Sequence, residues 1–151
     1  MLFVCLGNIC RSPTAEAVLR GRLREHRLDD RVTVDSAGTH GYHIGRGPDA
    51  RAIEAARRRG YSLEGQTARQ VTPEDLERFD YILCMDQPNL ENLRRLGSGR
   101  SVEVRLFLDY TDSEISEVPD PYYGGDKGFE QVLDLVEDAC EGLIRELRQR
   151  L

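Results

Sequence analysis

A cysteine, an arginine and a serine lie close together near the start of the chain, with a spacing that suits covalent catalysis on an anion. The stretch Cys-Leu-Gly-Asn-Ile-Cys-Arg-Ser occupies residues 5–12. Five residues separate Cys5 from Arg11, so a curled loop can bring the guanidinium over the anion that the sulfur attacks, as a bidentate clamp. A neighbouring arginine and a helix N-terminus both favour the thiolate, the nucleophilic form of cysteine. The pattern therefore predicts a nucleophile, Cys5, at the floor of an oxyanion site.

The residues on either side of this stretch predict the elements that must hold it. Leu2–Val4 is a short apolar run of the kind that forms a buried parallel strand. After the loop, the pattern indicates a helix that begins with Ser12 as its N-cap, Pro13 at its first position and Glu16 in its first turn. A strand, a small loop and a helix N-terminus together form an anion site.

The loop between strand and helix is the predicted phosphate-binding loop. Its backbone N–H groups can all point at one tetrahedral anion. Asn8 follows Gly7 where the chain must turn sharply, and Asn is among the few residues that accept a left-handed backbone. The hydroxyl of Ser12 can donate to the thiolate and later stabilise it as a leaving group. A lone cysteine here would more simply be a buried free thiol, but this combination favours catalysis. The predicted phosphate-binding residues are Leu6, Gly7, Asn8, Ile9, Cys10, Arg11 and Ser12.

Apolar runs alternate with helical periodicity along the rest of the chain. This alternation predicts an α/β fold, a three-layer sandwich with a central four-stranded parallel sheet flanked by helices. The phosphate-binding loop then follows the first strand, at the carboxyl edge of the sheet. We expect residues 1–151 to form a single domain. Further strands are predicted at 32–36, 81–85 and 102–107, and helices at 14–27, 49–59, 88–96 and 128–151, with a short one opening at 72–75.

Composition narrows the possible functions. The chain has 21 basic and 27 acidic residues and a net charge of −6, which argues against a general nucleic-acid binder. No apolar run approaches membrane-spanning length, and we see no secretion signal or lipidation motif. The four cysteines match neither a zinc site nor a disulfide framework. We therefore expect a cytoplasmic protein with reduced thiols, without a metal or another cofactor.

Four segments, in order, resemble the low-molecular-weight protein tyrosine phosphatases. The resemblance spans nearly the whole chain. It implies hydrolysis of phosphotyrosine and aryl phosphates through a cysteinyl-phosphate, with phosphate and other oxyanions as inhibitors. A phosphotyrosine-containing protein or peptide would be the partner, and the enzyme would be a monomer or a weak dimer. The segments are Cys5–Pro13, Asp35–Thr39, Phe79–Asp86 and Asp120–Gly124.

The resemblance also assigns roles to residues outside the loop. Asp120, which precedes Pro121, would be the general acid that protonates the leaving oxygen and then activates water. On local sequence alone, Asp-Pro in a loop is ordinary turn chemistry. Ser36 would hydrogen-bond Asn8 and support the loop. Where eukaryotic members carry a histidine that buttresses the loop, this chain has Gln66, which brings hydrogen bonds but no charge.

Aromatic side chains would form a deep slot for a flat phenyl ring. By resemblance, Tyr122 lines one wall of the cleft and Tyr42 the opposite wall, with Tyr123 beside them and the apolar edge of Ile9 between the walls. Such depth favours phosphotyrosine, since the shorter phosphoserine would hold its phosphate out of reach of the sulfur. His43, next to Tyr42, could contact a substrate peptide.

Other readings of the same pattern remain open. Protein arginine phosphatases of this fold usually carry threonine at the position of Ile9. An arsenate reductase would need a pair of cysteines after the third strand, whereas Cys84 falls on that strand. A non-catalytic phosphate-binding module would lack one of Cys5, Arg11 and Asp120. A further hypothesis concerns Cys10, which could form a reversible disulfide with Cys5 under peroxide and protect the nucleophile.

Overall fold

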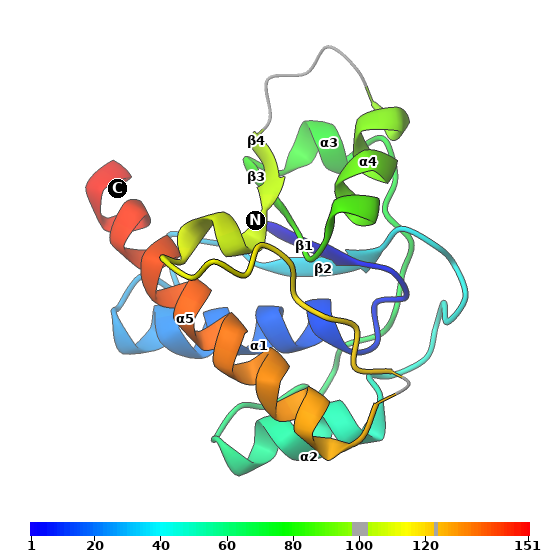
Figure 1. Ribbon diagram of the computed structural model, residues 1–151. Helices are drawn as coiled ribbons and strands as arrows, with labels where there is room; N and C mark the ends of the chain where they lie inside the picture. Colours follow the sequence, from blue (N-terminus) through cyan, green and yellow to red (C-terminus); the bar gives the residue numbers. More distant parts are fainter. Residues whose placement is uncertain (98–102, 123) are drawn as a thin grey trace.

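A central parallel sheet lies between two layers of helices in the computed structural model, which describes residues 1–97, 103–122 and 124–151 (Figure 1). The strands are β1 (Leu2–Cys5), β2 (Asp35–Gly38), β3 (Tyr81–Cys84) and β4 (Glu103–Leu106), in the order β2-β1-β3-β4. The helices are α1 (Arg11–Glu25), α2 (Ala50–Arg58), α3 (Asp75–Arg78), α4 (Gln87–Leu96) and α5 (Asp126–Arg150), with a 3₁₀ helix η1 (Phe107–Tyr110) after β4. The predicted three-layer α/β sandwich is confirmed.

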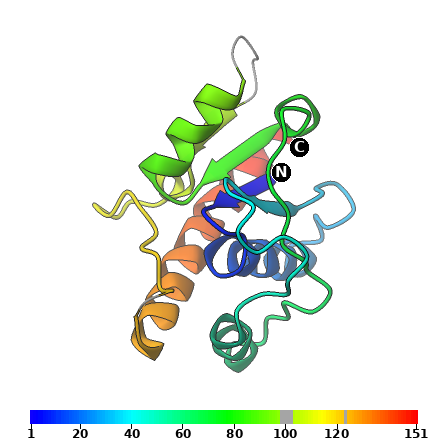
Figure 2. The same ribbon diagram turned by 90° about the vertical axis from the view of Figure 1, so that its right-hand side faces the viewer.

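Each face of the sheet packs against its own group of helices. Along β1, Phe3 and Cys5 point into a core shared with α1, α2 and α5, whereas Leu2 and Val4 point into a second core shared with α3 and α4. Figures 1 and 2 show these two groups of helices on opposite sides of the sheet. Because both faces are covered, a central strand must be apolar at every position, which explains the uninterrupted run at Leu2–Val4.

The order of the strands places a ligand site at the end of β1. From β1 the chain crosses to β2 on one side, and it later returns to β3 on the other side of β1. The loops at the carboxyl ends of these strands therefore leave in opposite directions, and the crevice between them is where open α/β sheets bind ligands. Cys5 is the last residue of β1, as predicted from the sequence.

The second strand lies further along the chain than we predicted. Its expected range was 32–36, but β2 begins at Asp35 and ends at Gly38. The β-branched residues before Asp35 suggested the earlier start, whereas pairing with β1 decides the position, with Phe3 opposite Ser36 and Cys5 opposite Gly38. A Cβ on Gly38 would lie 2.9 Å from the Leu6 carbonyl oxygen, so glycine allows β2 to end against the phosphate-binding loop.

The start of the first helix also differs from the prediction. α1 begins at Arg11 with Cys10 in the N-cap position, so Ser12 is not the N-cap, and Pro13 is the third helical residue. The hydroxyl of Ser12 is used instead inside the loop. The helices predicted at 49–59, 88–96 and 128–151 are confirmed within one or two residues, whereas η1 was not predicted. Val102, the predicted first residue of the last strand, lies outside the described residues.

Within the described residues, no helix is both long and apolar enough to span a membrane.

Candidate active site

Three carbonyl oxygens of the phosphate-binding loop point outward, to backbone N–H groups of other segments. The carbonyl oxygens of Cys5, Leu6 and Ile9 accept hydrogen bonds from the backbone N–H groups of Thr39, His40 and Asp49, at 2.8, 3.1 and 2.8 Å. In a trans peptide the following N–H points away from the carbonyl. Outward carbonyls therefore direct the N–H groups of the next residues inward, which is the arrangement that binds an oxyanion.

Asn8 fixes the sharp turn of the loop. Its φ angle is +59°, in the left-handed region, as the Gly-Asn pair predicted. Its buried side-chain amide donates to the hydroxyls of Ser12 (2.9 Å) and Ser36 (3.0 Å), and its amide oxygen accepts from the backbone N–H of Arg69 (3.0 Å). The hydrogen bond between Asn8 and Ser36 is the contact that the family resemblance implied for Ser36.

Cys5 lies on the floor of the loop, with Ser12 beside it. The Ser12 hydroxyl is 3.0 Å from the sulfur of Cys5, and both side chains are buried. Because this hydroxyl also accepts from Asn8, its own proton can turn toward the sulfur, or toward the Ala37 carbonyl oxygen at the longer distance of 3.5 Å. A hydroxyl in this position stabilises a thiolate, whether as the attacking group or as the leaving group.

Arg11 is buried beneath the site and held by groups from distant parts of the chain. Its Nη1 donates to a carboxylate oxygen of Asp86 at 2.7 Å and to the backbone oxygen of Val118 at 3.0 Å. Burial works against the charged guanidinium, but the nearby Cys5 and the hydrogen bond to Asp86 outweigh it and raise the pKa of Arg11. The site therefore holds a permanent positive charge.

Asp86 is a site residue whose role the sequence did not reveal. Besides Arg11, it accepts from the backbone N–H of Asn89 at 3.0 Å, so it also caps the N-terminus of α4. Its place directly after the predicted strand at 81–85 was the available signal, because carboxyl-end residues of adjacent parallel strands meet at one edge.

Asp120 reaches the site from the loop before α5. Its Oδ2 lies 3.6 Å from Nη2 of Arg11, and its Oδ1 accepts from the backbone N–H of Tyr122 at 3.0 Å. The Asp120 side chain is 38% exposed, whereas that of Arg11 is 3% exposed. The carboxylate thus stands at the boundary between the buried cation and solvent, where a group that exchanges protons with water must be.

A cavity of about 130 Å³ opens above the loop. It brings together the predicted nucleophile, arginine and carboxylate with the predicted ring-binding residues Ile9, Tyr42 and Tyr122. His43 also lines it and packs over Gly7, where a Cβ would lie 2.9 Å from the imidazole. Tyr123 lies outside the described residues. The full lining is Cys5, Leu6, Gly7, Ile9, Cys10, Arg11, Tyr42, His43, Asp120 and Tyr122.

Behind the loop, Ser36 joins Asn8 to two further polar side chains. The Ser36 hydroxyl donates to Glu16 at 2.8 Å and lies 3.5 Å from the amide oxygen of Gln66. The Gln66 amide donates to the carbonyl of Pro13 in α1 at 3.0 Å. Gln66 therefore hydrogen-bonds the first helix and lies beside Ser36 in the loop support, without a charge of its own.

The family model described as low molecular weight phosphotyrosine protein phosphatase matches residues 1–151. The chain belongs to this family. YfkJ of Bacillus subtilis, a low molecular weight protein-tyrosine-phosphatase, is 44% identical over 151 residues, which cover 99% of this chain and 96% of YfkJ. The crystal structure of a protein tyrosine phosphatase from Entamoeba histolytica superposes with a TM-score of 0.93 at 44% identity, covering 98% of this chain and 96% of that one.

Two other structures of similar fold differ in the ligand or the activity that is named for them. Wzb of Vibrio vulnificus was solved in complex with benzylphosphonate and has a TM-score of 0.83 at 31% identity, covering 96% of each chain. The Drosophila arginine phosphatase has a TM-score of 0.91 at 32% identity, covering 97% of this chain and 96% of that one. The fold therefore accommodates more than one kind of phosphoryl substrate.

The remaining cysteines of this phosphatase lie in its core. Cys84 is buried on β3, and burial raises the pKa of its thiol to about 12. Cys140 is buried on α5, where burial likewise raises its pKa. Such thiols are poorly nucleophilic. Across residues 1–97, 103–122 and 124–151, no group of three or more His, Cys, Asp or Glu side chains is placed to hold a metal ion.

Proposed function

We propose that this phosphatase hydrolyses phosphotyrosine in two steps through a cysteinyl-phosphate. The Cys5 sulfur attacks phosphorus, the bond to the tyrosine oxygen breaks, and Asp120 donates its proton to that oxygen. Asp120 then takes a proton from a water molecule that attacks phosphorus, and the phosphorus–sulfur bond breaks to restore the thiolate and release phosphate. The observation that carries this proposal is the single cavity lined by Cys5, Arg11 and Asp120.

The electrostatics of the site support the same sequence of steps. The transferred phosphoryl group carries its charge on three oxygens, and catalysis depends on holding that charge in a preorganised field. The inward N–H groups of Leu6, Gly7 and Cys10 and the buried guanidinium of Arg11 supply such a field before substrate arrives. Asp86 holds that guanidinium in place, so little reorganisation accompanies the reaction.

The walls of the cavity favour an aryl phosphate. Tyr42 and Tyr122 lie around it with Ile9, so a phenyl ring entering the cavity meets aromatic and aliphatic surface. Phosphoarginine is the second candidate substrate, because a structure of similar fold is an arginine phosphatase. Ile9 favours the phenyl ring, because protein arginine phosphatases of this fold usually carry threonine at this position.

Hydrolysis of para-nitrophenyl phosphate at mildly acid pH in EDTA tests the mechanism. We expect robust wild-type turnover, none from Cys5→Ser, and a loss of roughly 10²-fold or more from Asp120→Ala, in the range that general acid catalysis supplies. Turnover by Cys5→Ser equal to that of wild type would contradict the cysteine mechanism. A wild type that binds phosphate without hydrolysis would instead indicate a binding module.

The substrate preference is tested with one peptide that carries either phosphotyrosine or phosphoarginine. The expected result is a kcat/KM that is higher for phosphotyrosine in the wild type and shifts toward phosphoarginine in Ile9→Thr. A wild type that prefers phosphoarginine would reverse the substrate assignment while leaving the mechanism intact.

A further inference from the structure

Arg51, in the first turn of α2, holds the segment that carries Asp120. Its guanidinium donates to the backbone oxygen of Tyr122 at 2.9 Å and to that of Gly124 at 3.3 Å. We call residues 118–124 the acid loop, because they contain Asp120. The guanidinium also donates from Nε and Nη2 to the Asp49 carboxylate, at 3.1 and 3.0 Å. One planar group thus joins the acid loop to the start of α2.

Asp49 connects the same group to the phosphate-binding loop. Its carboxylate caps α2 by accepting from the backbone N–H of Arg51 at 2.8 Å, and its own N–H donates to the carbonyl of Ile9 at 2.8 Å. The side-chain hydrogen bond from Arg51 is the main cause that holds the pKa of Asp49 below its usual range. The charged Asp49–Arg51 pair therefore links the loop that binds phosphate to the loop that supplies the proton.

Two aromatic rings lie within cation–π distance of the Arg51 guanidinium. The Arg51 Cζ lies 4.9 Å from the centre of the Phe129 ring, in the first turn of α5, and 5.7 Å from that of the Tyr122 ring. Lysine keeps the charge of arginine but has neither the planar fork nor the stacking surface, so it could not make these contacts together.

Asp120 depends on such an anchor because its own contacts are local or loose. One carboxylate oxygen bonds within the acid loop, to the N–H of Tyr122, and the other lies 3.6 Å from Arg11, longer than a hydrogen bond. The backbone oxygen of Val118 bonds Arg11 at one end of the acid loop. At the other end, the bonds from Arg51 hold residues 122 and 124.

We propose that Arg51, oriented by Asp49, is a positioning residue that places the Asp120 carboxyl over the leaving oxygen. Arg51 does not line the cavity with the nucleophile, so it acts through Asp120. The proposal rests on the proposed function, in which Asp120 protonates the leaving group. Misplacement by even a small distance weakens a proton transfer, because a general acid must be within hydrogen-bond reach of its target.

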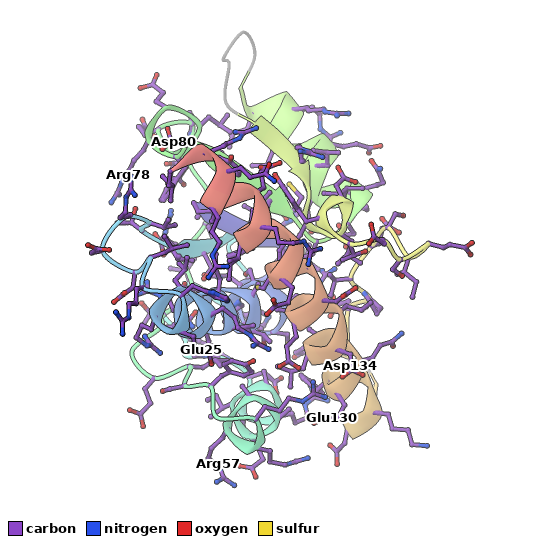
Figure 3. The ribbon with its side chains drawn as sticks, turned by 90° about the vertical axis from the view of Figure 1, so that its left-hand side faces the viewer. Glu25, Arg57, Arg78, Asp80, Glu130 and Asp134 are labelled. Atoms are coloured by element: carbon purple, nitrogen blue, oxygen red, sulfur yellow. The ribbon has the colours of Figure 1, made fainter. Side chains whose placement is uncertain are left out.

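The leaving group offers a direct test, with kcat/KM measured for 4-nitrophenyl phosphate and for phenyl phosphate. Nitrophenolate leaves with little help from an acid, whereas phenolate needs a proton. We expect Arg51→Lys to lose about tenfold with phenyl phosphate and less than about threefold with 4-nitrophenyl phosphate, as partial loss of general acid catalysis requires. Arg57→Lys is the matched control, because Arg57 also lies on α2 but donates to Glu54 of the same helix and points outward from the molecule (Figure 3).

Measuring Arg51→Lys in the Asp120→Ala background separates an effect through Asp120 from a general loss of activity. If Arg51 acts through Asp120, adding Arg51→Lys to Asp120→Ala leaves the ratio of the two substrates unchanged. An equal loss with both substrates, or the same loss in the Asp120→Ala background, would overturn the proposal. Arg51→Gln repeats the measurement if Arg51→Lys does not unfold cooperatively. Absence of turnover in the wild type would instead refute the proposed function.

Discussion

The position of Asn8 makes two requirements, one on the backbone and one on the side chain, and asparagine meets both. The turn requires a left-handed backbone at a position that is 3% exposed, and the surrounding hydroxyls require an amide. Glycine would satisfy the backbone and not the hydroxyls. Alanine would satisfy neither. The two substitutions therefore separate the cost of the conformation from the cost of the hydrogen bonds.

We expect Asn8→Ala to lower the free energy of unfolding by about 2–4 kcal/mol, the sum of left-handed strain and of buried hydrogen bonds lost. Asn8→Gly should cost about 1–2 kcal/mol less than Asn8→Ala, because glycine adopts the turn without strain. Urea unfolding of the three proteins measures both values. Equal losses for the two variants would show that the backbone conformation of Asn8 contributes nothing.

Cys10 lies in the same loop as the nucleophile but in a different electrostatic state. It is buried, and burial raises the pKa of its thiol to about 12, with the nearby Asp49 adding to the shift. Cys10 is therefore a protonated thiol at neutral pH. A thiol of this kind resists peroxide itself but can still react with a sulfenic acid formed on Cys5, releasing water and forming a disulfide.

We expect peroxide to inactivate the wild type reversibly and Cys10→Ser irreversibly, because only the wild type can trap the sulfenic acid of Cys5 as a disulfide. The measurement is the activity recovered with dithiothreitol after a peroxide pulse. Cys84→Ser is the control, since Cys84 lies on β3 outside the loop and should recover like the wild type. Full recovery of Cys10→Ser would contradict a protective role for Cys10.

At the scale of elements, Glu137 of α5 gathers polar contacts from both neighbouring helices. It accepts from Arg22 of α1, from Arg59 at the end of α2 and from the hydroxyl of Tyr61. Nearer the N-terminus of α5, Glu130 and Asp134, both labelled in Figure 3, also pair with Arg59. These contacts fix α2 against α5, and α2 carries the Arg51 that we propose positions the acid loop.

Tyr61 makes the packing of α2 against α5 sensitive to alkaline pH. Burial and its bond to Glu137 raise the pKa of Tyr61 from 10.0 to about 12. Between these values the folded chain keeps a proton that the unfolded chain has lost, so stability falls as pH rises from about 10 to about 12. Tyr61→Phe should be less stable than wild type at pH 8, and the difference should shrink toward pH 12. Urea unfolding across this range checks it, and a constant difference would contradict the linkage.

Helix periodicity and apolar runs predicted most elements, but contacts between distant residues decided the rest. α2, α4 and α5 carry their own signals, such as Asp49 before α2 and a long apolar stripe along α5. β2 has none, because Asp-Ser-Ala-Gly is a strand only through its pairing with β1.

Some residues of the candidate site could likewise be predicted from the sequence, whereas others are placed by contacts between distant residues. Residues 5–12 could be predicted from local spacing, and Asp120 from the family resemblance. Two contacts join residues that lie far apart in the sequence, Asp86 with Arg11 and Arg51 with Tyr122. No local sequence pattern predicts them. Ser12 was assigned to the helix cap because its place in the sequence suits a cap, whereas in the structure its hydroxyl accepts from Asn8 and lies 3.0 Å from the sulfur of Cys5.

At the scale of the whole molecule, the site lies where both cores of the sheet meet. Arg11 begins a helix of one core, and its partner Asp86 begins a helix of the other. An anion bound by Arg11 therefore engages a side chain that is itself bonded to both layers, so ligand binding and global stability are coupled.

Phosphate at 100 times its Kd should stabilise the fold by about 2.7 kcal/mol, which raises the Tm of a chain of this size by roughly 5–10 °C. Arg11→Lys, which cannot clamp the anion with two nitrogens, should show less than about half of that shift at the same phosphate concentration. Thermal unfolding with and without phosphate measures it. An unchanged shift in Arg11→Lys would remove Arg11 from the binding site.

The distance along the chain between Cys5 and Asp120 has a consequence for biosynthesis. Cys5 leaves the ribosome more than a hundred residues before the acid loop and before Phe129, the α5 ring that contacts Arg51. A partly made chain carries the nucleophile without the proton donor, so it can neither expel a tyrosine nor release a trapped phosphate efficiently. Efficient catalysis thus begins only after the acid loop has been synthesised, and proteolytic fragments that end before Asp120 should be inert as phosphatases.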